Sequence, residues 1–401
     1  MNPLSAALQP KQPRARRNGG ATLATVLLLA LWLSCGGSSG SSGSGSSGPP
    51  SKIAKRVFVT NQTTTVGIAN GILEIINALN DTIGGAVNLT NRPSIIVVTP
   101  DKTKSLIFDQ QDQAVQVIDN TKETLAGTIA VGEQTTSMVA LSDNKFGYVA
   151  LRNLGQVSII DIVNFKVTVN IPIPTVRTLV KSHNGSKVLA FSDESDSLNI
   201  IDTSTNQASP VGGFDRPVFG VFSTDDSKAF ILSCGAECGG GTARVTVLDV
   251  ATKTAGQSVN VSAATTGLLD GANLYVAGTR LGAGRLDVVN TSTMAVTKSA
   301  VPISDGFHNQ IALAGGKLFI GARTCNNVTN GCLSIFDTAA QTAVIDAPKG
   351  DVTGMQPIDG RNVVYVVEGG ELRIYSTQTG AEQTNPSIDI VGRAVDVKAI
   401  D

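Results

Sequence analysis

A five-residue pattern recurs along the chain and constrains its fold more than any other feature. Each copy reads apolar, polar, apolar, apolar, and then a short side chain that carries an oxygen atom. The eight copies are Leu73–Asn77, Val115–Asp119, Val157–Asp161, Leu198–Asp202, Val245–Asp249, Leu286–Asn290, Leu333–Asp337 and Leu372–Ser376. Their closing residues lie 42, 42, 41, 47, 41, 47 and 39 positions apart. This period is typical of the four-stranded blade of a β-propeller.

The closing residue of the pattern is acidic in five copies, which could suggest repeated catalytic groups. The other three copies end in Asn77, Asn290 and Ser376. Asp, Asn and Ser share a short oxygen that accepts a backbone N–H in a tight turn. We therefore interpret these positions as turn residues.

The two ends of the repeat region predict how the ring closes. Arg56–Asn61 reads as the second strand of a blade that lacks its own first strand. Arg393–Asp401 resembles the first-strand segments Arg92–Asp101 and Arg216–Asp225. We expect it to complete the first blade, because closure removes exposed sheet edges. The sequence thus predicts an all-β fold, a β-propeller of eight four-stranded blades. Seven blades are the alternative if one repeat is irregular.

Charge and histidine content exclude several classes of function. Residues 51–401 hold 27 basic and 32 acidic side chains, so the repeat region has no excess of positive charge for a phosphate backbone. We expect no nucleic-acid partner. The chain has only two histidines, His183 and His308. Sites built from several imidazoles are therefore disfavoured, and we predict neither a cofactor nor a metal.

The N-terminal segment reads as an export signal, residues 1–34. Basic residues up to Arg17 precede a 13-residue apolar run, Ala21–Leu33, which is short for a membrane span but suits a signal peptide. The run leads into Ser34 and Cys35, which resemble the lipobox of bacterial lipoproteins. That resemblance implies lipidation of Cys35, although Trp32 departs from the usual Leu or Val. Ordinary signal cleavage is the alternative.

Residues 35–50 combine this cysteine with a Gly- and Ser-rich stretch that has nothing to bury and predicts a flexible tether. Residues 51–401 then form a single propeller domain. We expect an exported, membrane-anchored lipoprotein that faces the periplasm or the cell exterior. Gly36 after the cysteine resembles lipoproteins sent to an outer membrane, where the organism has one.

The remaining cysteines form two local pairs, Cys234 with Cys238 and Cys325 with Cys332. Both pairs fall between the second and third strands of their repeats, and these are the two repeats with 47-residue spacing. An oxidising compartment and an even count predict two disulfides that staple the longer loops. A metal shared by both pairs is the alternative.

At this level of detail the chain resembles the YVTN-type β-propeller repeat family, which includes surface-layer and lactonase-like proteins. Val57–Asn61 approaches the strand that names the family, and the closing Val-Ile-Asp with its Pro-Asp or Asp-Gly turns matches the repeat. The resemblance covers residues 56–401. It implies the fold but selects no activity, because its members range from surface adhesins to lactone hydrolases.

Several basic side chains are candidates for ligand binding at one mouth of the central channel. In a propeller, the loops between second and third strands and the connections between blades share one face. The candidates near the starts of first strands are Arg92, Arg177, Arg216, Arg393 and His308. The candidates in the loops are Arg152, Arg280, Arg285 and Arg323. A cationic mouth would attract an anion. The alternative is that these arginines pair with nearby acids such as Asp215 and Asp351 and tie the blades together.

These observations favour a non-catalytic envelope module that binds a protein or a surface polymer. We identify no catalytic residue. The alternative is a lactonase-like hydrolase that acts on a small anionic lactone at the channel mouth, with arginines and His308 polarising the substrate.

Overall fold

The computed structural model describes residues 50–62, 71–326, 329–383 and 392–401. The expected signal at 1–34, Cys35 and the tether up to residue 49 lie outside this part of the chain. The described residues form β-strands almost throughout, with one short 3₁₀ helix, η1 (Gly235–Cys238). Among these residues no helix is long and apolar enough to cross a membrane.

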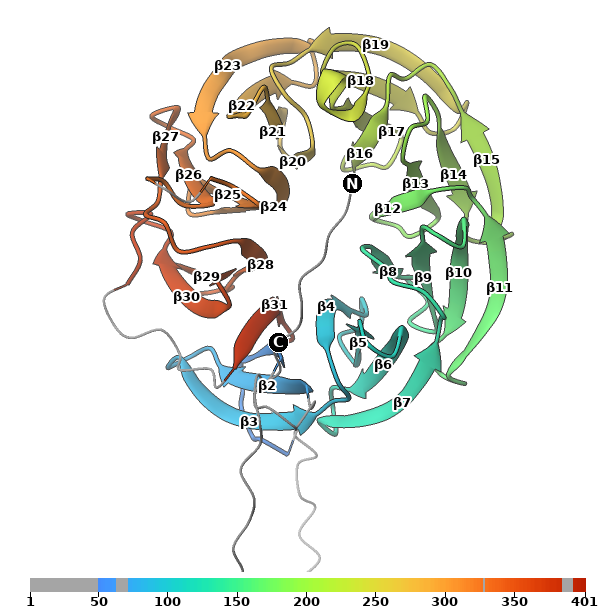
Figure 1. Cartoon of the computed structure of the whole chain (residues 1–401), viewed down its shortest axis with the longest axis vertical. Helices are drawn as coiled ribbons and strands as arrows, with labels where there is room; N and C mark the ends of the chain where they lie inside the picture. The colour runs from blue at the N-terminus through green and yellow to red at the C-terminus, as the bar shows by residue number, and fades with distance from the viewer. Residues whose placement is uncertain (1–49, 63–70, 327–328, 384–391) are drawn as a thin grey trace, which may run out of the picture. The chain divides into compact units, whose positions relative to one another are not determined.

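Eight antiparallel sheets stand around a central axis and form a closed ring (Figure 1). In the described part of the chain, seven sheets have four strands. The eighth has three, and an isolated bridge between Tyr375 and Glu382 extends it. The chain is therefore an eight-bladed β-propeller, as the repeat predicted, and the seven-blade alternative is wrong.

We call the strands of each blade A to D from the axis outward. The A strands are β31 (Arg393–Ala399), β4 (Pro93–Val98), β8 (Met138–Ala140), β12 (Val176–Lys181), β16 (Pro217–Phe222), β20 (Thr266–Asp270), β24 (Phe307–Ala314) and β28 (Val352–Pro357). The B strands are β1 (Arg56–Gln62), β5 (Lys104–Asp109), β9 (Phe146–Leu151), β13 (Lys187–Ser192), β17 (Lys228–Ser233), β21 (Asn273–Arg280), β25 (Lys317–Arg323) and β29 (Val363–Glu368).

The outer half of each blade contains the repeated pattern and the strand that follows it. The C strands are β2 (Gly71–Asn77), β6 (Ala114–Asp119), β10 (Gln156–Asp161), β14 (Leu198–Asp202), β18 (Arg244–Asp249), β22 (Ala283–Asn290), β26 (Leu333–Asp337) and β30 (Glu371–Ser376). The D strands are β3 (Thr82–Asn88), β7 (Thr124–Ala130), β11 (Lys166–Pro172), β15 (Gln207–Val211), β19 (Thr254–Asn260), β23 (Ala295–Ile303) and β27 (Thr342–Ile345).

The closing residue of every pattern caps the turn between the C and D strands. All eight accept a hydrogen bond from the backbone N–H two or three positions further on, at 2.8 to 3.2 Å. At Asp119, burial raises the pKa, but hydrogen bonds from Thr121 and Lys122 outweigh it and lower the pKa to about 2. These acids are turn residues, as the sequence indicated.

The polar second residue of the pattern has a role that the sequence did not reveal. Several of these side chains are buried and accept a backbone N–H from the D–A connection that enters their blade. Gln116 accepts from Thr90 at 3.1 Å, and Ser334 accepts from Ser304 at 2.7 Å. Asp287 does the same for the connection that enters the sixth blade. These bonds fix the inter-blade connections at the face where the channel opens.

The hydrophobic core is divided among the contacts between neighbouring blades. In the part of the chain that the structure describes, buried side chains form eight clusters, and each combines residues of two adjacent blades. The cluster at the junction, for example, joins Val57 and Val397 of the first blade to Tyr365 of the eighth. Each blade therefore buries its two faces only when both neighbours are in place.

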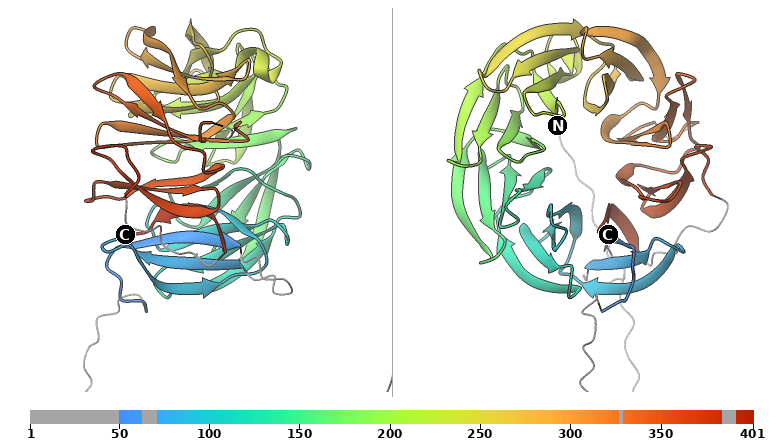
Figure 2. Two further views of the ribbon diagram at one scale, coloured as in Figure 1. Left: turned by 60° about the vertical axis from the view of Figure 1, so that its left-hand side comes forward. Right: turned by 180° about the vertical axis from the view of Figure 1, so that it is seen from behind.

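The first and last described segments close the ring. β31 pairs antiparallel with β1, with Val57 opposite Ala399, so the C-terminal strand completes the first blade (Figures 1 and 2). Beside this pairing, Arg56 is buried and contacts Asp401 through Nε at 2.7 Å and Nη2 at 2.8 Å. Arg56 also lies 3.2 Å from Glu123 of the second blade. One guanidinium thus ties the two ends of the ring to the next blade.

We predict that Arg56→Gln lowers the free energy of unfolding by about 1 to 3 kcal/mol at pH 7, because it leaves partly buried carboxylates without their cation. Burial raises the pKa of Asp401, but its hydrogen bonds with Arg56 outweigh this and lower it. The pair's contribution is therefore present above pH 4 and is lost as the pH falls through the lowered pKa.

Chemical denaturation at pH 7 and at pH 3 measures both effects. Lys122→Gln, which removes an exposed ion pair with Asp119, is the control and should change stability by less than about 0.5 kcal/mol. Equal stability of Arg56→Gln and wild type at pH 7 would contradict the closure role of Arg56.

Candidate functional site

All eight blades contribute to one cavity at the channel mouth. The cavity has a volume of about 660 Å³, and its wall includes residues from every A strand or from the connection before it. Residues from the loops between B and C strands, such as Arg152 and Glu237, complete its rim. This volume lies within the range of small-molecule binding sites.

A recurring bulge in the inner strands shapes this wall. In six of the eight blades, the pairing of the A and B strands shifts by one residue near the start of the A strand. The residues left out of register include Ser94, Arg177, Val218, Asn309, Thr353 and Val395, and all six line the cavity. Bulges redirect side chains at the rims of closed sheets. The fold therefore presents one side chain per bulged blade to the channel.

Neighbouring A strands are joined around the cavity by side-chain hydrogen bonds to the backbone. Thr265 donates to the carbonyl of His308 at 3.1 Å, and Gln310 donates to the carbonyl of Thr353 at 3.1 Å. Asp396 accepts the backbone N–H of Ile96 at 2.9 Å. These bonds satisfy polar backbone groups that the bulges expose, so the cavity wall is held in a defined shape.

The structure brings together five of the nine predicted ligand-binding residues. Arg152, Arg177, Arg216, Arg323 and His308 line the cavity. The other four, Arg92, Arg280, Arg285 and Arg393, are not part of its lining. No observation tests ligand contact by any of the nine, so their binding role stays a prediction.

The mouth is not the cationic surface that the sequence suggested. Its lining includes four arginines and also four acids, Asp193, Glu194, Glu237 and Asp396. Arg152 and Arg177 both pair with Asp193, at less than 4 Å, and Arg216 lies 3.7 Å from Asp196. Arg152, Arg177 and Arg216 therefore pair with acids, as the alternative interpretation expected. Their partners are Asp193 and Asp196 rather than the acids named from the sequence.

His308 differs from the exposed polarising group that the hydrolase interpretation needs. Its side chain is fully buried, and its Nδ1 lies 3.5 Å from the Thr279 hydroxyl. The equivalent position in four other A strands holds an apolar residue, namely Pro93, Val176, Pro217 or Val352. Burial lowers the pKa of His308 to about 4, against the opposing effects of the Ser304 carbonyl and Asp305. The imidazole is therefore neutral at pH 7 and packs inside the wall.

Both predicted disulfides are present, in the loops predicted for them. Cys234 joins Cys238 across η1, and Cys325 joins Cys332 between β25 and β26. Cys238 lines the cavity, so the first disulfide shapes its rim. A carboxylate from the preceding D–A connection holds the first stapled loop, because Asp215 accepts the backbone N–H of Gly241 at 2.9 Å. Disulfides of this kind indicate an oxidising compartment outside the cytoplasm.

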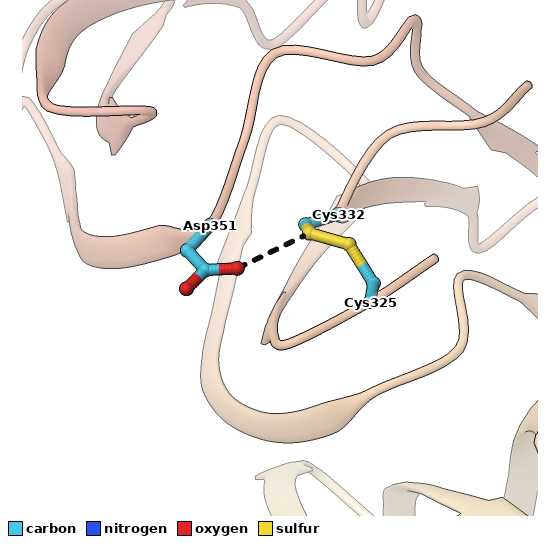
Figure 3. A group of neighbouring side chains, drawn as sticks. All are labelled: Cys325, Cys332 and Asp351. Carbon is cyan, nitrogen blue, oxygen red and sulfur yellow. Dashed lines mark hydrogen bonds between the residues drawn. A yellow bond between two sulfur atoms is a disulfide. The ribbon is translucent and has the colours of Figure 1, made fainter. Parts of the chain in front are cut away.

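Asp351 holds the second stapled loop and lies beside its disulfide (Figure 3). Its carboxylate accepts the backbone N–H of Thr324 at 2.8 Å and approaches Cys332 Sγ to 3.8 Å. Cys325, Cys332 and Asp351 form a group of potential metal ligands, and Cys234 and Cys238 do not join it within the described residues. Because the two sulfurs are bonded to each other, they are not thiolates that could bind a metal. The shared-metal alternative is therefore not supported.

The sequence matches no protein-family model and no curated protein. Solved structures share the fold. Dihydro-heme d1 dehydrogenase NirN superposes with a TM-score of 0.67 at 11% identity, over 87% of this chain and 75% of that chain. Kuenenia stuttgartiensis hydrazine synthase superposes with a TM-score of 0.56 at 15% identity, over 72% of this chain and 96% of that chain. The Myceliophteria thermophila Cps50 (Swd1) propeller domain superposes with a TM-score of 0.53 at 14% identity, over 71% of this chain and 97% of that chain. These similarities show the β-propeller fold alone.

The cavity offers hydrogen-bonding and apolar contacts rather than a recognisable acid–base pair. Of its acids, Asp193 is engaged by two arginines and Asp396 by Ile96 and Lys398. Phe307 adds an aromatic ring that is 43% exposed. The arrangement suits reversible recognition of a polar ligand.

Proposed function

We propose that this chain is an exported, lipid-anchored propeller that binds a protein or a surface polymer without chemical conversion. The observation that supports it most is the cavity to which all eight blades contribute, in which arginines hold Asp193 and backbone N–H groups hold Asp396 and Glu237. A site of this kind recognises a ligand through fixed donors and acceptors. The YVTN-type repeat resemblance is compatible with this function, since that family includes surface adhesins.

The lactonase-like alternative has less support. It needs a general base or a metal near the reacting carbonyl, within hydrogen-bond reach. His308 is buried in the wall, and the one potential metal group in the described residues contains a disulfide. The fold does not decide between these functions, because propellers with similar structures have unrelated names and roles.

The membrane anchor is tested at Cys35. We predict that Cys35→Ser moves the chain from the membrane fraction to the soluble fraction of the envelope and abolishes incorporation of a labelled fatty acid. Retention of both label and membrane association by Cys35→Ser would contradict lipidation at this residue.

The binding role is tested by filling the cavity. Thr178 lines the cavity and donates no hydrogen bond to the described residues, so we predict that Thr178→Trp blocks binding without disturbing the blade. The matched control is Thr342→Trp on the outer strand β27, where Thr342 is exposed. Capture from envelope extract with the full-length chain should recover a saturable partner with wild type and control. Recovery should be at least about tenfold lower with Thr178→Trp.

Undiminished capture by Thr178→Trp would place binding elsewhere on the ring. Absence of any saturable partner, combined with lactone hydrolysis that Thr178→Trp abolishes, would replace the proposed function by the hydrolase alternative.

A further inference from the structure

Two arginines from different sides of the ring converge on one aromatic side chain in the cavity. Arg177 lies on β12 of the fourth blade, and its guanidinium carbon is 5.3 Å from the centre of the Phe307 ring. Phe307 begins β24 of the seventh blade, across the channel from β12 (Figure 1). Its cross-strand partner is Arg323, the last residue of β25. Paired residues of antiparallel strands have side chains on the same face, so Arg323 flanks Phe307 within its own blade.

The two arginines differ in how their charge is balanced. Arg177 lies 3.4 Å from Asp193, a carboxylate that it shares with Arg152. Arg323 is half-buried, and among the described residues no carboxylate lies within ion-pair distance of it. Burial lowers the pKa of Arg323, although Asp396 and Asp351 attract its charge from further away. A desolvated cation without a close partner is unfavourable, unless a ligand supplies the anion.

Polar atoms without partners gather around Arg323. Its guanidinium donates one hydrogen bond, from Nη2 to the Thr353 carbonyl at 3.2 Å. Its Nε, the side-chain oxygen of Asn309 and the Thr353 hydroxyl are buried and have no hydrogen-bond partner among the described residues. All three side chains line the cavity. Native proteins leave few buried polar atoms unpaired, so this part of the wall has polar groups that the protein itself does not satisfy.

We propose that Arg323 and Arg177 bind the carboxylate of a ligand in this cavity, with the side-chain amide N–H of Asn309 and the hydroxyl of Thr353 donating further hydrogen bonds and Phe307 contacting its carbon skeleton. The planar guanidinium fork matches the two oxygens of a carboxylate. The inference deepens the proposed binding function and rests on the same cavity. The carboxylate belongs either to a free organic acid or to an acidic unit of a surface polymer, such as a uronic acid.

Isothermal titration of the purified full-length chain tests this with two probes, succinate and trigalacturonate. Arg323→Gln should weaken binding about ten- to hundredfold, the loss expected for a charged hydrogen-bonded contact. Its melting temperature should not fall below that of wild type, because the replacement removes an unpaired buried charge. Lys166→Gln is the control, since Lys166 is exposed at the start of the outer strand β11 and outside the cavity lining. This control should bind like wild type.

Binding of both probes supports recognition of a free acid, and binding of trigalacturonate alone supports a polymer unit. Equal affinity of Arg323→Gln and wild type overturns the proposal, as does the absence of saturable binding of either probe to the folded wild-type chain. The result is independent of envelope capture. A chain that captures a partner through the cavity but ignores both carboxylates keeps the proposed function and loses this inference.

Discussion

The pairing of β31 with β1 is the interaction on which the rest of the structure depends. It joins segments separated by almost the whole described chain, and the contact of Arg56 with Asp401 secures it. Every core cluster lies between two blades, so an open ring would expose an apolar face at each free end. A closed ring has no such end. The stability of each blade is therefore coupled to this single junction.

Ring closure also creates the candidate site. The eight A strands, arranged around one axis, enclose a cavity of about 660 Å³ at the loop face, and no one blade supplies its wall alone. The bulges direct one side chain per bulged blade into this space, and hydrogen bonds between A strands hold the wall. Most charges there are balanced within the protein. Arg323 has no carboxylate within ion-pair distance among the described residues, and we propose that it gives the cavity a preference for carboxylate ligands.

The sequence predicted the features that depend on local or repeated patterns. Eight copies of one pattern gave the number of blades, and the varied residues at its end identified the turn caps correctly. The resemblance of Arg393–Asp401 to other first strands predicted the closure. The position of the cysteines in the two longest repeats predicted both disulfides. Each of these conclusions required comparison only within the chain, because the repeats share one local geometry.

The site was less predictable, because it depends on register and on distant contacts. A one-residue bulge decides whether a side chain faces the channel or the neighbouring blade. His308 falls just before the bulge and is fully buried in the cavity wall, whereas Asn309 is the residue that the bulge leaves out of register. The apolar residues aligned with His308 in other repeats were the available signal. The partners of Arg177 and Arg216 could not be foreseen, since Asp193 and Asp196 come from the loops of a folded blade.

Native-state hydrogen exchange, measured by mass spectrometry over a series of low denaturant concentrations, tests the central claim most directly. If closure holds the ring, amides of β1 and β31 exchange only through the same global opening as the inner strands β12 and β24, with the same free energy. The account would be contradicted if the amides of β31 exchanged through an opening of distinctly lower free energy while those of β12 and β24 stayed protected. In that case the ring, and the cavity that it encloses, would persist without the junction.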